Sequence, residues 1–286
     1  MGLTSEFEKT LSEKFIGTSE RSSSKSILVE RVLIPLLTKF SGVEDYEEIC
    51  DEKLIGLSVS KADDLEEVFN RLRFNVSIHS NAHADLKAQY IVVSNHPTGP
   101  LEGIFMQKIF NHLGLRGKTM GDDIMSGVAP MKDAYIGIST RVNGKSRISQ
   151  LRAVKKEISS GLSLGLFPAG SVSHFDFKNL RVKESEWRPG FIDMAKSNNL
   201  DILPVFIDTN LSVLHYFFKL VYSDISSLRL FKESTKFIDR SKGKYINIYI
   251  GNPIEISNLE STKENACKIH DICENLKYQS YSEVKK

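Results

Sequence analysis

The chain has 286 residues, of which 41% are hydrophobic and 26% are charged. This composition fits an ordinary globular protein and neither a disordered chain nor a polytopic membrane protein. A formal net charge of +2 gives no basis for generic nucleic-acid binding. Three cysteines are too few for a disulfide framework and indicate a reducing, cytosolic compartment. No apolar run approaches the roughly 20 residues of a membrane span, and the start of the chain lacks the pattern of a secretory signal, so any membrane contact is expected to be peripheral.

The first quarter of the chain is predicted to be helical. An amphipathic helix is expected over 4–15, followed by a Ser-rich linker at 19–26. The segment 27–40 is typical of a mostly buried helix with a bend near Pro35, because proline removes a backbone donor. Residues 44–70 are acid-rich and favour one or two solvated helices.

Strand patterns recur through the rest of the chain. Short apolar runs predict strands at 74–79, 90–95, 162–167, 202–207 and 245–251. The first two of these strands are joined by a polar turn. The later strands are spaced widely enough for a helix to lie between them, as in a parallel sheet.

Helix patterns lie between the predicted strands. Apolar residues at helical spacing predict helices at 101–113, 146–160 and 187–196. The shared face of the second helix consists of Ile148, Leu151, Val154 and Ile158. The alternation predicts an α/β fold in which helices flank a mostly parallel central sheet. We assign three regions: a helical N-terminal extension at 1–72, the α/β domain at 73–275 and a polar tail at 276–286.

The most informative segment is VVSNHPTGPLEG, at 92–103. A strand runs into Asn95 and His96, a Pro/Gly turn follows, and Glu102 lies in the first turn of the next helix. A histidine at the C-terminal edge of a strand faces the crevice where open α/β sheets bind ligands. A carboxylate six residues later could fix the tautomer of the imidazole and stabilise the imidazolium. Such a pair could deprotonate a substrate hydroxyl. The alternative is a solvated loop histidine and an acid favoured by the helix dipole.

A second segment, LGLFPAGSVSH at 164–174, is a strand that opens into a Pro/Gly loop. Backbone N–H groups in such a loop, here around Gly170, can bind an oxyanion or a phosphate. Directly upstream, 138–156 carries cations and no acid, which is typical of a solvated helix face. It could alternatively attract a phosphate-bearing substrate or anionic lipid head groups. The cations are Arg141, Lys145, Arg147, Arg152, Lys155 and Lys156.

The blocks SNHPTGPLEG, FPAGSVS, WRPGF and ILPVFI, taken in this order, resemble the glycerolipid and lysophospholipid acyltransferases, the superfamily of 1-acylglycerol-3-phosphate acyltransferase. The subgroup of lyso-ornithine-lipid and hemolysin-type acyltransferases is the most similar. The resemblance covers roughly 74–253. It implies O-acyl transfer from acyl-CoA or acyl carrier protein to a lysolipid or related hydroxyl acceptor. It implies no metal and no bound cofactor, and a peripheral enzyme on the inner, cytoplasmic face of a bacterial membrane.

Carried over residue by residue, the resemblance implies that His96 is the general base and that Glu102, in the place of the family's aspartate, orients it. It places acceptor binding at 167–171, a phosphate contact at Arg141, and the acyl-donor site near 203–205. The predicted substrate-binding residues are Asn95, Gly99, Arg141, Phe167, Pro168, Ala169, Gly170 and Ser171.

Two departures from the family pattern bear on activity. Glu102 keeps the charge of the aspartate but adds a methylene, and a displacement on the order of 1 Å can cost about a hundredfold in rate. Ala169 and Ser171 lie where relatives carry acids, which leaves acceptors other than lysophosphatidic acid open. The first alternative function is therefore a catalytically degenerate protein of this fold that binds lipid or an acyl carrier.

Three further patterns have plainer explanations. The run Gly161–Gly165 matches the nucleophile elbow of α/β-hydrolases, but that motif needs its serine between a strand and a helix. A serine hydrolase acting through Ser163 is the second alternative. A zinc site on a C-terminal helix would need a fourth ligand, so buried thiols are favoured. The segment 211–222 favours a core helix, with an interfacial membrane anchor as the alternative. The three candidate ligands of that zinc site are Cys267, His270 and Cys273.

Overall fold

The computed structural model arranges seven strands in one sheet. It describes residues 3–16, 29–80, 88–122, 125, 128–138, 144–176, 180–209, 234, 235, 238, 244–257 and 259–279. The strands of the sheet are β1 (Phe74–Ser80), β2 (Ile91–Ser94), β3 (Gly117–Asp122), β4 (Tyr135–Ile138), β5 (Ser163–Leu166), β8 (Ile202–Asp208) and β9 (Lys244–Ile250). They lie in the order β1-β9-β8-β2-β5-β3-β4. Every neighbouring pair is parallel except β8 and β9, so the predicted mostly parallel sheet is confirmed.

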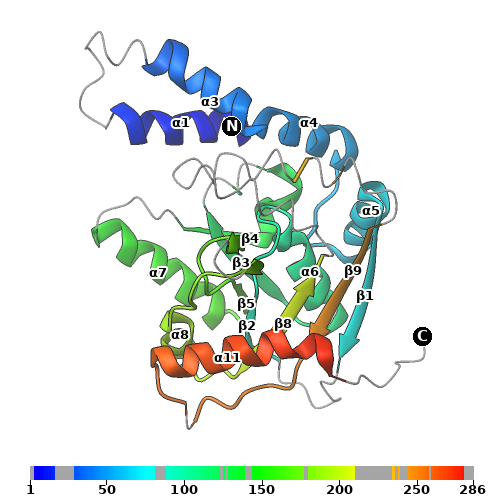
Figure 1. The fold of residues 1–286 in the computed structure, drawn as a ribbon, viewed down its shortest axis with the longest axis vertical. Helices are drawn as coiled ribbons and strands as arrows, with labels where there is room; N and C mark the ends of the chain where they lie inside the picture. Colours follow the sequence, from blue (N-terminus) through cyan, green and yellow to red (C-terminus); the bar gives the residue numbers. More distant parts are fainter. Residues whose placement is uncertain are drawn as a thin grey trace.

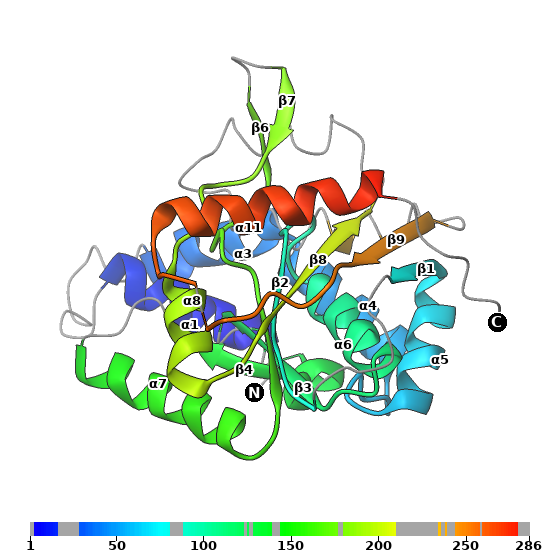
Figure 2. The ribbon, with the colours of Figure 1, turned by 90° about the horizontal axis from the view of Figure 1, so that it is seen from below.

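Helices cover both faces of this sheet (Figures 1 and 2). They are α5 (Ala62–Leu72), α6 (Glu102–His112), α7 (Gly144–Ser159), α8 (Gly190–Asn198) and α11 (Lys263–Asn275). Successive side chains of a strand point to opposite faces, and β2 shows the division. Val92 lies in one core with Phe105 of α6, whereas Ile91 and Val93 lie in a second core with Ile192 of α8. A central strand buried on both faces explains why this segment is a continuous apolar run.

Three helices from the N-terminal part of the chain stack beside one end of the sheet (Figure 1). They are α1 (Leu3–Ile16), α3 (Ile34–Ser41) and α4 (Val43–Leu54). The helix predicted at 4–15 is confirmed, and the acid-rich segment contains two helices, α4 and α5. These two are less solvated than predicted, because each buries an apolar face that includes Tyr46 in α4 and Phe69 in α5.

The prediction of one mostly buried helix over 27–40 is wrong. A π-helical turn at Val29–Leu33 precedes α3, and the side chains of Val32 and Leu36 are exposed. Pro35 lies in the first turn of α3. Backbone N–H groups in the first turn of an α-helix make no hydrogen bond within that helix, so proline is tolerated there. The chain is helical from 29 to 41, and the proline follows the change from π-helix to α-helix, so the difference from the prediction is the exposure of this segment. The predicted linker at 19–26 lies outside the described residues.

The α/β body extends beyond 73–275 in both directions. At the N-terminal side α5, which was assigned to the extension, packs on the sheet, and the ring centroid of Phe69 lies 6.3 Å from that of Phe105. At the other end Leu276, assigned to the polar tail, is buried. The side chain of Leu276 packs closely on Gly251: a Cβ atom added to Gly251 would lie 2.8 Å from a methyl carbon of Leu276.

Several elements carry no clear sequence signal. Besides β3 and β4, a hairpin of β6 (His174–Asp176) and β7 (Arg181–Lys183) was not predicted. β3 reads GKTMGD and lacks apolar alternation, because its glycines let large rings approach: a Cβ at Gly117 would lie 2.6 Å from Phe110. β1 and β2, predicted in succession across a turn, are separated in the sheet by β9 and β8.

The apolar face predicted for 146–160 is only half correct. Val154 and Ile158 are buried under α7, but Ile148 and Leu151 are 52% and 51% exposed. Among the described residues, no helix combines the length and the apolar character needed to cross a bilayer. The apolar segment 211–222 lies outside the described residues.

Candidate active site

The order of the strands changes direction at β2. The chain leaves β2 through α6 and returns at β3, beyond β5, whereas it leaves β5 through α8 and returns at β8, on the other side of β2. Connections that leave neighbouring parallel strands in opposite directions open a ligand-binding crevice between them. His96 follows β2, and the loop at 167–171 follows β5. The two segments singled out in the sequence therefore lie side by side.

His96 and Glu102 form a hydrogen-bonded pair. Nδ1 of His96 contacts Oε2 of Glu102, and the second carboxylate oxygen of Glu102 accepts from the backbone N–H of Thr98. The Glu102 side chain is fully buried, whereas that of His96 is 19% exposed. We assign the proton to Nδ1 because a carboxylate can only accept there. Nε2 is then the unprotonated nitrogen, available to take a proton from a substrate.

The turn between the two residues depends on glycine. Gly99 has a φ of 97°, a backbone conformation that favours glycine, and its carbonyl accepts from the N–H of Glu102 at 3.2 Å. Gly103 admits the ring of Tyr135 against the first turn of α6, since a Cβ at Gly103 would lie 1.8 Å from the tyrosine oxygen. Burial and the nearby Glu102 raise the pKa of Tyr135, so the hydroxyl stays neutral. Tyr135 was missed, although a glycine after Glu102 in an apolar helix was a signal for close packing.

Phe167 lies against the imidazole of His96. Val93 of β2 pairs with Leu166 of β5, so the residues that follow these strands meet. The two rings stack with centroids 4.7 Å apart and planes inclined by 15°. Phe167 was predicted to bind substrate, and its position also restrains the rotation of the general-base candidate.

The rest of the loop at 167–171 forms a tight turn. Gly170 has a φ of 65°, and its N–H donates to the carbonyl of Phe167 at 2.9 Å. This N–H is therefore used within the turn, so the expected oxyanion or phosphate contact would fall to other backbone N–H groups around Gly170. Ala169 is buried, the carbonyl of Pro168 accepts from Arg188 N–H at 3.3 Å, and the hydroxyl of Ser171 lies 2.7 Å from that of Ser185.

Other predicted substrate contacts have a different placement. The amide of Asn95 is buried and exchanges two hydrogen bonds with the backbone of Ile207, at 2.9 and 2.8 Å, so its polar groups bind the protein's own main chain. The segment 203–205 lies within β8 and is buried. Arg141 lies outside the described residues.

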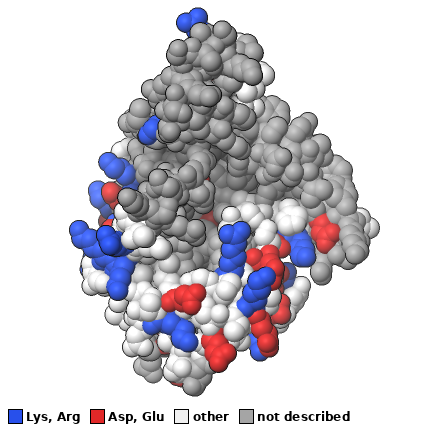
Figure 3. All heavy atoms as spheres, turned by 90° about the vertical axis from the view of Figure 1, so that its left-hand side faces the viewer, with Lys and Arg blue, Asp and Glu red and all other residues white. Residues whose placement is uncertain are grey.

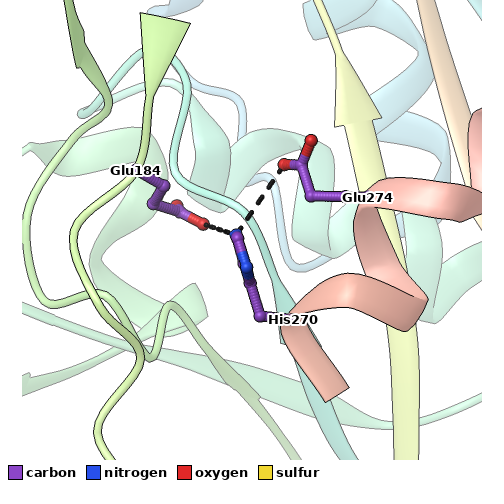
Figure 4. Close-up of side chains that lie close together, drawn as sticks. All are labelled: Glu184, His270 and Glu274. Atoms are coloured by element: carbon purple, nitrogen blue, oxygen red, sulfur yellow. Dashed lines mark ion pairs between the residues drawn. The ribbon is translucent and has the colours of Figure 1, made fainter. Parts of the chain in front are cut away.

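Glu184 is a site residue that the sequence analysis missed. Its carboxylate accepts from the backbone N–H of His96 at 2.5 Å and from the indole N–H of Trp187 at 2.7 Å. An acid within the charged run KESEW gave no signal of burial. His270 and Glu274 of α11 lie beside it (Figure 4). In the described part of the chain, these three acidic and imidazole side chains are the grouping that could hold a metal ion, with ligand atoms within 4.8 Å of one another.

The structure also places the residues of the two alternative sites, the serine nucleophile and the zinc site. Ser163 is buried at the beginning of β5, and its hydroxyl accepts from the N–H of Tyr90 at 3.1 Å, which is not the geometry of a nucleophile elbow. Of the two helical thiols predicted to be buried, Cys273 is buried and Cys267 is exposed. His270 contacts Glu184 at 3.4 Å rather than joining those thiols in a zinc site.

The described cations of α7 lie on its exposed side. They are Arg152, Lys155 and Lys156, and the apolar side chains of Ile148 and Leu151 are exposed on the same helix. Figure 3 views the molecule from the side on which α7 lies in Figure 1. On this face Lys and Arg side chains gather at the left edge, while basic and acidic side chains mix at the lower right.

Comparison with known proteins bears on the whole chain. A family model described as Acyltransferase matches residues 64–281. No curated protein matches the sequence. Among solved structures, the crystal structure of the 1-acyl-sn-glycerophosphate (LPA) acyltransferase PlsC from Thermotoga maritima is similar over 99% of this chain and 97% of that chain, with 14% sequence identity and a TM-score of 0.45. Because the family model covers well over half of the sequence, the chain belongs to the acyltransferase family.

Proposed function

We propose that this acyltransferase moves a fatty acyl group from an acyl thioester, acyl-CoA or acyl carrier protein, to a hydroxyl of a lysolipid or related acceptor. The observation that carries the proposal is the His96–Glu102 pair: a buried carboxylate holds Nδ1 of a partly exposed imidazole at the C-terminal edge of the sheet. This arrangement is suited to general-base catalysis without a protein nucleophile.

The chemical step balances with these residues alone. Nε2 of His96 takes the proton of the acceptor hydroxyl as its oxygen attacks the thioester carbonyl carbon. Glu102 stabilises the imidazolium that forms. The tetrahedral intermediate collapses with cleavage of the C–S bond, and the leaving thiolate takes the proton from His96. Since the hydroxyl attacks the donor directly, no acyl-enzyme forms, and chelation with EDTA is expected to leave turnover unchanged.

The loop after β5 supplies the remaining contacts of the proposed site. With the N–H of Gly170 used in the turn, we assign the backbone N–H of Ser171 to the developing oxyanion or to an acceptor phosphate. The hydroxyl of Ser171, in contact with that of Ser185, provides a neutral hydrogen-bonding group where relatives carry an acid. An acceptor other than lysophosphatidic acid is consistent with this exchange, and Arg141 stays a proposed phosphate contact.

The substrates also call for contact with a lipid surface. The exposed cations of α7 beside exposed Ile148 and Leu151 fit a peripheral contact with anionic head groups. We place this contact on the inner, cytoplasmic face of a bacterial membrane. Sedimentation with vesicles tests it: binding should require anionic lipid and weaken at high salt, and equal binding to neutral vesicles would contradict it.

The activity is tested with purified protein, acyl-CoA or acyl carrier protein as donor, and a panel of lysophospholipids and lyso-ornithine lipid, with products identified by mass spectrometry. We expect one donor–acceptor pair to give diacyl product and the intact mass of the enzyme to stay unchanged.

A catalytically degenerate protein would bind lipid without forming product. A silent wild type that becomes active as Glu102→Asp would favour this alternative. A serine hydrolase would be labelled at Ser163 by a fluorophosphonate probe, and we expect no label.

A further inference from the structure

The main chain of His96 is held from both sides by the segment that follows the β5 loop. On one side Glu184 accepts its N–H at 2.5 Å. On the other side the N–H and the hydroxyl of Ser173 donate to its carbonyl at 2.8 and 3.2 Å. Glu102 and Phe167 contact the ring. The position of the imidazole therefore depends on main-chain contacts as well as on its own side-chain partners.

The carboxylate of Glu184 uses its two oxygens for two different N–H donors. Oε1 accepts from the backbone of His96, and Oε2 accepts from the indole of Trp187. The Glu184 side chain is 3% exposed, so both bonds are made in a region of low dielectric where charged acceptors bind strongly. Accepting through two separate oxygens suits a carboxylate, because an amide offers one oxygen and one NH2 group.

The C-terminal helix places an imidazole beside this carboxylate. Nε2 of His270 points to the carboxylate of Glu184, 3.4 Å from Oε2, and lies 3.9 Å from a carboxylate oxygen of Glu274 (Figure 4). Its ring centroid lies 5.1 Å from that of Trp187. Glu184 thus connects α11, the segment before α8 and the end of β2.

We propose that Glu184 is a positioning residue for the acyl transfer proposed above: by accepting the backbone N–H of His96, it holds Nε2 where it meets the acceptor hydroxyl. This inference rests on the proposed function of His96. General-base catalysis requires heavy-atom separations of about 2.6 to 3.2 Å, and a displacement of about 1 Å can cost about a hundredfold in rate. Glu184 does not touch the reacting atoms and acts through the backbone of His96.

The test is Glu184→Gln, which keeps the size of the side chain and places an NH2 group against one of the two N–H donors. We expect kcat to fall about tenfold to a hundredfold with KM for both substrates within about twofold, because substrate contacts are unchanged. Glu184→Asp, which keeps both acceptors on a shorter side chain, should lose less. The matched control is Glu186→Gln, at an exposed side chain two residues away that pairs with Lys263 at 3.9 Å, and it should leave kcat unchanged.

A second-site variant separates positioning from a general loss of structure. In Glu184→Gln with Trp187→Phe the indole donor is gone, so the amide oxygen can accept from His96 while the NH2 group meets no opposing N–H. The double variant should regain most of the kcat lost in Glu184→Gln, although Trp187→Phe on its own lowers stability by enlarging a cavity. If the two changes instead lower kcat further, or if folded Glu184→Gln has the kcat of the wild type, the inference is overturned.

The same assay distinguishes this inference from the proposed function. His96→Ala is measured beside these variants. Loss of turnover in His96→Ala with full turnover in Glu184→Gln overturns the role of Glu184 alone. Full turnover in His96→Ala overturns the proposed function, and the positioning role of Glu184 with it.

Discussion

The ring of Phe167 stacks on the imidazole of His96, with centroids 4.7 Å apart. The contact joins the ends of two neighbouring parallel strands, β2 and β5, and it sets the ring of His96 against the loop that we assign to substrate binding. It therefore places the base against the acceptor site as well as limiting its rotation.

Removing this ring should lower turnover without unfolding the protein. Phe167→Ala frees the imidazole to adopt other rotamers, and we expect kcat to fall about tenfold, whereas Phe167→Tyr should stay close to the wild type. Steady-state kinetics at saturating donor and acceptor check this. A Phe167→Ala enzyme with wild-type kcat would show that the stacking does not position His96.

Removing the charge of Glu102 should be more severe. In Glu102→Gln the NH2 group would face another donor, either the N–H of Thr98 or Nδ1–H of His96. The neutral amide would also no longer stabilise the imidazolium. We expect Glu102→Gln to lower kcat by a factor on the order of a thousand. Glu102→Asp should lose less, since the charge remains. Equal activity of the Gln variant and the wild type would exclude Glu102 from the mechanism.

Gly103 should be intolerant of any side chain. A Cβ there would lie 1.8 Å from the oxygen of Tyr135, so Gly103→Ala must displace a buried ring beneath the first turn of α6, at a cost of about 1 to 3 kcal/mol or more. Gly190→Ala is the matched control, because it also lies at the beginning of a helix and a Cβ there meets nothing within 4 Å. Thermal unfolding should rank Gly103→Ala well below Gly190→Ala, and equal melting temperatures would contradict the packing described.

Stability should depend on pH through His270. Burial lowers its pKa, but Glu184, Glu274 and Asp271 outweigh burial and raise it above 6.5. A histidine with a raised folded-state pKa stabilises the fold fully below its unfolded pKa, and this contribution is lost as pH rises through the folded value. Burial also raises the pKa of Glu274 above 4.5, despite the opposing effects of Lys277 and His270, so ionising this acid in the fold lowers stability with rising pH as well.

Melting temperatures measured between about pH 6 and pH 8 show whether stability falls or rises with pH. The wild type should become less stable as pH rises through this range, and His270→Asn should show a flatter dependence because the titrating ring is gone. A melting temperature that rises with pH over this range in the wild type, and equally in His270→Asn, would contradict the assignment.

The sequence predicted those parts of the site that are local. His96 and Glu102 are six residues apart, and the strand, the Pro/Gly turn and the helix between them fix their relation. The loop after β5 lies beside them because β2 and β5 are neighbours in the sheet, and this strand order was not predicted. The mostly parallel sheet followed from alternating strands and helices.

The parts that were missed depend on distant partners. Glu184 meets His96 across 88 positions of sequence, and nothing in a charged run distinguishes a buried carboxylate from exposed ones. Tyr135 packs against Gly103, next to Glu102, from a four-residue strand that has no apolar periodicity. Ile148 and Leu151 have the spacing of a buried face yet are exposed, because helical spacing shows which residues share a side and not what covers it.

The central claim is that His96 acts as the general base, and the rate of acyl transfer by His96→Ala tests it most directly. The variant should fold with a lower melting temperature, because the buried Glu102 loses its partner, and its kcat with the best donor–acceptor pair should fall by a factor on the order of a thousand. A folded His96→Ala enzyme that turns over at the wild-type rate would contradict the account.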